Sequence, residues 1–229
     1  MTTLVDWQIW DLQNTGVTST RIIPDPQVRV LEGVLKLTRI EAFGFQIEGY
    51  EDFDAQLQPA SFDVAIGDRL QVMHAVSSRD LAAPRAIYPD PESSAPQDRL
   101  NLPWVERMPD PDRNGGLLLA PGEFALASTR ETLHLPDNIL ARVEGKSTVA
   151  RCGLLVHVTA GFIDPGFSGQ VTLELYNLAP VALVIYPGDL IAQVAFELTS
   201  DCGVPYDGKY QGQEGIGLPR RRGLHRQDS

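Results

Sequence analysis

The chain has 229 residues, of which 43% are hydrophobic and 21% are charged, a composition typical of a globular protein that can bury its own core. Its formal net charge of −11 argues against a non-specific nucleic-acid binder, because such proteins are usually basic. No run approaches the roughly 20 apolar residues of a membrane span, and the first residues lack the basic and apolar regions of a signal peptide. We therefore expect a cytoplasmic protein with no nucleic-acid and no membrane partner. Cys152 and Cys202 form no CxxC motif, so we expect two reduced thiols.

The first residues have the pattern of a short amphipathic helix. Leu4, Trp7 and Trp10 recur at helical spacing, Thr3 is a candidate cap, and the Asn-Thr-Gly of residues 14–16 is a stop signal. The pattern predicts one short helix in which the two tryptophans are packing residues.

Most of the remaining chain has the pattern of short strands. Apolar and polar residues alternate over 28–30, 34–37 and 62–66, and a turn signal follows at residues 67–68. Strand patterns return from 117 to about 198, separated by Pro-Gly turns. Short strands with regular Gly and Pro punctuation predict an all-β sandwich or barrel.

Residues 77–116 interrupt this pattern. They contain seven prolines among many Asp and Ser residues. Because proline lacks a backbone donor and fixes φ, we expect an irregular surface insertion here, anchored by Trp104.

The segment 144–151, Glu-Gly-Lys-Ser-Thr-Val-Ala-Arg, contains groups suited to an anion. Its backbone amides, two hydroxyls and two cations can donate hydrogen bonds to a phosphate. It is a poor match to a Walker-type loop, because the first glycine of that motif is absent. An ordinary polar turn is the alternative.

The segment 156–177 holds two carboxylates of interest. Val171, Leu173 and Leu175 alternate with polar residues, so Glu174 projects from the face opposite the core. Such a glutamate is either solvated or, in an apolar pocket, able to shuttle protons. Asp164 precedes a Pro-Gly pair, where aspartate often serves the turn. No histidine forms the HxE of zinc deaminases with a later PCxxC, so a deaminase here would work without zinc.

Several segments in the same order resemble the dCTP deaminase family, part of the dUTPase-like fold group. The resemblance covers about residues 56–75 and 117–213, and its motifs lie at 58–63, 144–151, 156–177, 187–193 and 209–213. It implies a distorted dUTPase-like β-barrel or jelly-roll with a short N-terminal helix, assembled as a homotrimer with sites at subunit interfaces. We expect a single dUTPase-like domain at 1–213, which includes the 77–116 insertion, and a flexible C-terminal arm at 214–229.

The resemblance also implies roles for individual residues. Glu174 matches the catalytic glutamate, Ser147 and Arg151 match residues that position the water and bind around the base and phosphates, and Asp164 matches the aspartate at the sugar 3′-hydroxyl. The remaining substrate-binding positions are Lys146, Thr148, Val158, Thr159, Ala160, Phe162, Gln193, Tyr206 and the tail residues Lys209, Tyr210 and Gln213. The implied ligands are dCTP and dUTP, with Mg²⁺ bound through the phosphates rather than by the protein, no zinc, and dTTP as a candidate inhibitor.

The product depends on residues 161–162. Members that only deaminate commonly have His-Arg there, whereas Gly161 and Phe162 resemble bifunctional members, which convert dCTP to dUMP, ammonia and diphosphate, and also true dUTPases. In both, the aspartate matching Asp164 activates a water for attack at the α-phosphorus. The alternatives are a deaminase that stops at dUTP, a plain dUTPase and a non-catalytic nucleotide-binding trimer. Glu174 together with Arg151 favours a deaminase.

Overall fold

The structure is a computed structural model that describes residues 2–20, 38–41, 44–73 and 104–219. The strands predicted at 28–30 and 34–37 lie outside the described residues, as do residues 77–103 of the expected insertion. Within the described part of the chain, no helix is long and apolar enough to cross a membrane. Cys152 and Cys202 are both free thiols.

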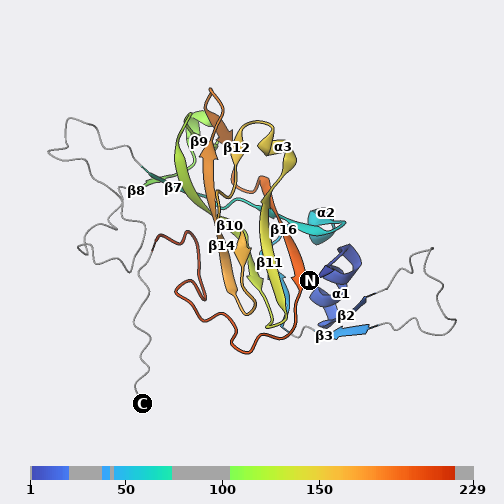
Figure 1. Cartoon of the computed structure of the whole chain (residues 1–229). Helices are drawn as coiled ribbons and strands as arrows, with labels where there is room; N and C mark the ends of the chain where they lie inside the picture. Colours follow the sequence, from blue (N-terminus) through green and yellow to red (C-terminus); the bar gives the residue numbers. More distant parts are fainter. Residues whose placement is uncertain (1, 21–37, 42–43, 74–103, 220–229) are drawn as a thin grey trace, which may run out of the picture.

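Two antiparallel sheets enclose the core, and their long strands lie side by side in Figure 1. The first sheet has the order β13 (Phe162–Ile163), β11 (Ile139–Gly145), β16 (Leu190–Leu198), β6 (Ser61–Ala65) and β5 (Leu57–Gln58), with β1 (Thr2–Thr3) beside β16. The second has the order β12 (Leu154–Leu155), β14 (Ser168–Asn177), β10 (Phe124–His134), β7 (Leu70–Met73) and β8 (Trp104–Arg107), with β4 (Gln46–Glu48) beside β10. The sheets bury one apolar core, which confirms the predicted all-β, dUTPase-like class.

Smaller elements complete the fold. Two short ladders pair β15 (Leu183–Ile185) with β9 (Leu117–Leu119) and β2 (Val17–Thr20) with β3 (Thr38–Glu41). The helices are α1 (Asp6–Thr15), α2 (Phe53–Gln56) and α3 (Ser147–Ala150), and Pro111–Arg113 form a 3-10 turn.

The predicted N-terminal helix is α1, and two details differ from expectation. Thr3 belongs to β1 rather than to a cap. Trp7 and Trp10, predicted as packing residues, are 39% and 46% exposed and therefore lie outside the buried face of the helix. The reason is that Ile9 and Leu12, which repeat at the same spacing, occupy the buried face of the helix.

Part of the expected irregular insertion is a regular strand. Residues 104–107 form β8, which pairs with β7, so the expectation of irregular structure is wrong there. The prolines of this region lie on either side of β8 and leave its backbone donors free to pair. The ring of Trp104 packs against Phe124 with centroids 6.0 Å apart, which agrees with its expected anchoring role.

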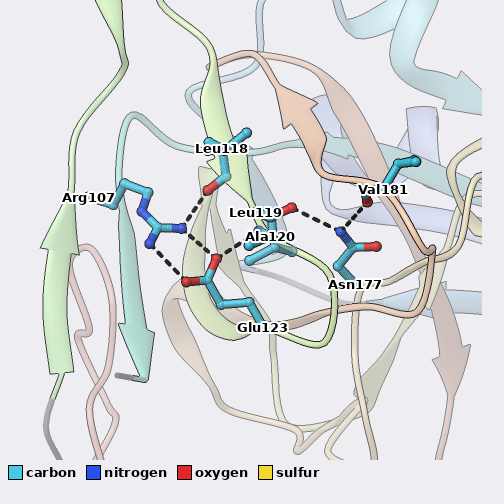
Figure 2. Close-up of polar contacts among 7 residues, drawn as sticks. All are labelled: Arg107, Leu118, Leu119, Ala120, Glu123, Asn177 and Val181. Atoms are coloured by element: carbon cyan, nitrogen blue, oxygen red, sulfur yellow. Dashed lines mark hydrogen bonds and ion pairs between the residues drawn. The ribbon is translucent and has the colours of Figure 1, made fainter. Parts of the chain in front are cut away.

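An ion pair fixes the chain where it returns from that region to the sheet (Figure 2). Arg107 donates to both carboxylate oxygens of Glu123, at 2.5 and 2.8 Å, and to the carbonyl of Leu118 at 2.7 Å. Glu123 in turn accepts from the backbone N–H of Ala120 at 2.8 Å. A bidentate pair of this kind restricts geometry more than a simple contact between two charges.

Asn177 connects the end of β9 to the turn after β14, beside that ion pair, and its replacement tests how much these hydrogen bonds contribute to stability (Figure 2). Its fully buried side chain donates to the carbonyls of Leu119 and Val181, each at 2.9 Å, and accepts from Ala179 N at 2.8 Å. Asn177→Ala leaves these groups without their partner, so we expect a loss of about 2–4 kcal/mol in unfolding free energy, measured by denaturant titration. Asn14→Ala, which removes one exposed hydrogen bond on α1, is the matched control. Equal denaturation midpoints for the two variants would show that the buried hydrogen bonds of Asn177 contribute no more to stability than an exposed one.

Glu131 makes stability depend on pH. Its carboxylate is fully buried and accepts from Gln56 Nε2 at 2.8 Å and from Ala65 N at 2.9 Å. Burial raises the pKa of Glu131 above its ordinary value, and the hydrogen bonds only partly oppose this.

Because its pKa is higher in the folded state, the stabilising effect of proton binding at Glu131 is complete below the unfolded-state pKa and is lost as pH rises through the raised folded-state pKa. We therefore expect the unfolding free energy of the wild type to fall relative to that of Glu131→Gln as pH rises above about 4.5. Chemical denaturation at a series of pH values measures this difference. A difference that is constant with pH would show that Glu131 has the same pKa in both states.

Candidate active site

Glu174 lies on the accessible face of β14. Alternate residues of this strand, including Val171, Leu173 and Leu175, are buried, while Glu174 is half-buried on the opposite face. The predicted two-faced strand is therefore confirmed.

The backbone of the loop after β12 orients the carboxylate of Glu174. Val158 N and Thr159 N donate to Oε2 at 3.1 and 3.4 Å. Within the described part of the chain, no group donates a hydrogen bond to Oε1. One oxygen is thus held by the loop, and the other can accept a proton from a bound molecule.

A pocket of about 340 Å³ opens in front of Glu174, a size within the usual range for small-ligand sites. Its wall combines an apolar surface with a few polar groups. The lining residues are Leu126, Ala160, Phe162, Ile163, Asp164, Phe167, Gln170, Val171, Thr172, Glu174, Tyr206, Tyr210, Gln213, Gly217 and Pro219. Seven of the residues predicted from the sequence are among them.

Asp164 closes a turn with its backbone and lines the pocket with its side chain. Its backbone carbonyl accepts from Phe167 N at 3.2 Å and closes the turn, in which Gly166 has a φ of 87°. Its exposed side chain lines the pocket with Glu174. The turn therefore leaves the carboxylate available to a ligand.

Phe162 lines one edge of the pocket and follows Gly161 in the chain. A Cβ on Gly161 would lie 2.7 Å from the carbonyl oxygen of Val143, so the chain here requires glycine or a local shift. Phe162 is 51% exposed, and the guanidinium of Arg142 lies 5.4 Å from the centre of its ring. The exposed ring of Phe162 shapes this edge, and the backbone just before it leaves no room for a Cβ without a local shift.

The segment 206–217, which we call the strap, covers the side of the pocket next to β14. Gln213 is buried, and its Nε2 donates to Thr172 Oγ1 at 2.8 Å and to Gln170 O at 3.0 Å. Gly217 N also donates to Thr172 Oγ1, at 2.9 Å. These contacts make Gln213 an anchor of the strap. The expected boundary after Gln213 therefore falls inside a segment that is hydrogen-bonded to β14, and residues 220–229 lie outside the described part.

Other strap residues contribute aromatic surface. Tyr206 packs on Phe167 with ring centroids 5.9 Å apart, and Tyr210 lines the pocket. Lys209 is exposed, with Nζ 5.1 Å from the centre of the Tyr210 ring. Thr172 and Gln170, which hold the strap, were not predicted as site residues from the sequence.

The remaining predicted residues form a second group elsewhere in the chain. Ser147, Thr148 and Arg151 are exposed on and just after α3, and Lys146 precedes that helix. Thr148 lines a different pocket, beside Cys152, and Gln193 lies on β16. None of these five residues lines the pocket of Glu174.

Two residues of the 58–63 motif support the second group. Asp63 forms an ion pair with Lys146, and Ser61 Oγ donates to Gln193 Oε1 at 3.2 Å. No role was predicted for either. A carboxylate between the apolar residues Phe62 and Val64 of a buried strand was the available signal for Asp63.

Comparison with known proteins agrees with this architecture. Residues 37–199 match the family described as dCTP deaminase-like. A protein of Nocardioides sp. named dCTP deaminase, dUMP-forming, is 42% identical over 78% of this chain and 88% of its own length. A protein of the same name from Streptomyces griseus is 40% identical over 77% of this chain and 86% of its own length.

A solved structure, the 2′-deoxycytidine 5′-triphosphate deaminase from Agrobacterium tumefaciens, is similar with a TM-score of 0.53 and 21% sequence identity. The match covers 86% of this chain and 48% of that chain, so this chain spans about half its length, and the likeness supports the fold alone. Because the family match covers most of the chain and relatives are about 40% identical over most of their length, the chain belongs to the dCTP deaminase-like family.

Proposed function

We propose that this chain is a zinc-independent, bifunctional dCTP deaminase that converts dCTP to dUMP, ammonia and diphosphate. The observation that carries the proposal is one pocket that holds two carboxylates, Glu174 and Asp164. The relatives named dCTP deaminase, dUMP-forming, support the same activity.

In the deamination step, Glu174 acts as general base and then as general acid. It takes a proton from the water that attacks C4 of cytosine and returns it to the leaving amine, which departs as ammonia. The fixed Oε2 and the accessible Oε1 suit this exchange, because proton transfer requires a positioned acceptor within hydrogen-bond reach. The products of this step are dUTP and ammonia.

In the second step, Asp164 takes the proton from a water that attacks the α-phosphorus. The P–O bond to the diphosphate breaks, and dUMP and diphosphate are formed. An exposed carboxylate on the pocket wall near Gly161 and Phe162 suits this role. The same aspartate, on the pocket wall, would also contact the sugar 3′-hydroxyl of a bound nucleotide.

We further propose that the two groups of site residues meet across a subunit interface of a homotrimer. Ser147 and Arg151 are exposed on α3 and do not reach the pocket of their own chain. A neighbouring copy can supply them to the open side of the pocket, where they would contact the base and the phosphates.

Mg²⁺ would be held mainly by the triphosphate. Among the residues that the structure describes, no imidazole or thiol lines the pocket, and its carboxylate, hydroxyl and amide oxygens are the donors that Mg²⁺ prefers. The ion would offset the charge of the phosphates when bound. A competing dTTP shares the pyrimidine and the triphosphate, so we propose it as an inhibitor, and a cytoplasmic location stays a prediction.

The test is product analysis with dCTP or dUTP and Mg²⁺. The proposal predicts dUMP and diphosphate from dCTP with little free dUTP. Persistent dUTP would indicate a deaminase only, and consumption of dUTP alone would indicate a dUTPase. If neither nucleotide reacts, a non-catalytic trimer becomes the better account.

A further inference from the structure

Asp63 is a buried carboxylate with an incomplete set of partners. It lies in β6 and is 2% exposed between Phe62 and Val64. Oδ2 binds the ammonium of Lys146, while Oδ1 is buried with no hydrogen-bond partner among the described residues. A buried carboxylate is strongly unfavourable unless a cation compensates it, so Asp63 depends on Lys146.

Lys146 is also tied down through its backbone. Its N–H donates to the carbonyl of Ile191 at 3.1 Å, and its carbonyl accepts from Ala150 N at 3.0 Å. The side chain is 27% exposed and turns toward β6. Three contacts therefore fix the residue that immediately precedes Ser147.

Helix α3, which follows Lys146, is too short to be stable without contacts to the rest of the protein. α3 has four residues, far fewer than an isolated helix needs for stability in water. Ser147 and Arg151 lie on and just after this turn, so their placement depends on how its ends are anchored. On the same strand as Asp63, Ser61 contacts Gln193, and the backbone of Gln193 pairs in register with Asp63.

We propose that Asp63 is a positioning residue: it holds Lys146, and Lys146 anchors the α3 loop that presents Ser147 and Arg151, rather than binding phosphate as a free cation. The ammonium already faces a carboxylate, so the pair brings little net charge to an anion. This inference rests on the proposed deamination, since it assigns Ser147 and Arg151 to the reaction.

Kinetics of Asp63→Asn, Lys146→Gln, Lys146→Arg and the double variant Asp63→Asn/Lys146→Gln test it. If Asp63 and Lys146 act as one unit, each neutral variant lowers kcat for dCTP about 10- to 100-fold with KM changed less than about threefold, and the double variant is no worse than either single variant. Lys146→Arg, which keeps the cation, retains kcat within about threefold. The control Asp68→Asn, an exposed carboxylate in the turn after β6, keeps wild-type kinetics.

Two results would overturn the proposal. If Lys146→Gln mainly raises KM while Asp63→Asn leaves KM and kcat unchanged, Lys146 is a phosphate ligand. If the effects of the two single variants multiply in the double variant, the residues act independently.

A second readout does not depend on activity, so it separates failure of this inference from failure of the proposed function. Acetylation with an N-hydroxysuccinimide ester, followed by mass spectrometry, compares Lys146 with the exposed Lys209 in the same sample. Asp63→Asn should raise labelling of Lys146 at least about fivefold relative to Lys209, because the ion pair no longer holds the ammonium. Unchanged labelling would contradict the pairing even if the wild type has no activity toward dCTP.

Discussion

Replacing Glu174 with Gln is expected to lower the turnover of dCTP by about 10²–10⁴-fold, because the amide cannot take and return the proton. The side chain keeps its size, and the amide oxygen can still accept from Val158 N and Thr159 N, so the fold and nucleotide binding should be retained. The release of ammonia from dCTP measures the loss. Hydrolysis of dUTP by the same variant should persist, since it depends on Asp164.

Glu106→Gln is the matched control for that experiment, because Glu106 is an exposed glutamate on β8 away from the pocket. It should deaminate dCTP at the wild-type rate. Ammonia release by Glu174→Gln at more than about a tenth of the wild-type rate would be too fast for a variant that lacks its general base, and the role of Glu174 would have to be abandoned.

Replacing Asp164 with Asn is expected to separate the two reactions. Deamination should change less than about tenfold, whereas formation of dUMP should fall by about 10²–10⁴-fold, because no carboxylate activates the second water. dUTP should then accumulate from dCTP, which chromatography of the nucleotides measures directly. The turn should survive, since its hydrogen bond uses the backbone carbonyl of Asp164.

Asp207→Asn, an exposed aspartate in the strap, controls for loss of one negative charge near the pocket. It should still produce dUMP. If Asp164→Asn forms dUMP from dUTP as fast as the wild type, the water at the α-phosphorus is activated by another group, and Asp164 serves the sugar or the turn only.

Local patterns in the sequence predict much of this fold. The alternation in β14 correctly predicts which face Glu174 occupies, because side chains alternate strictly along a strand. The turns at Gly67 and at residues 187–189 separate strands where the pattern predicts them. These features are local, so a single sequence carries them.

Pairing between distant segments is what the sequence does not reveal. β8 finds its partner in β7, more than thirty positions earlier in the chain, and the surrounding prolines hide its short pattern. Trp7 and Trp10 match a helical repeat as well as Ile9 does, and only the packed structure decides which face is buried.

The site likewise contains residues that the sequence predicts and residues that only tertiary contacts reveal. Seven residues of the pocket are predicted from motifs, but Thr172 and Gln170 are not, because their role depends on a strap more than forty residues later. Asp63 likewise pairs with Lys146 only in the folded chain, where β6 lies next to the loop before α3. Motifs identify groups that carry chemistry, while the residues that hold them become visible through tertiary contacts.

The most direct test of the central claim, two reactions in one pocket, is a trapping experiment. The wild type is mixed with radiolabelled dCTP, Mg²⁺ and a large excess of unlabelled dUTP, and the label in each nucleotide is followed. If dUTP is processed before it leaves the pocket of Glu174 and Asp164, the label passes to dUMP while the dUTP pool stays unlabelled. Label that accumulates in the dUTP pool, with labelled dUMP appearing only later, would contradict a coupled reaction.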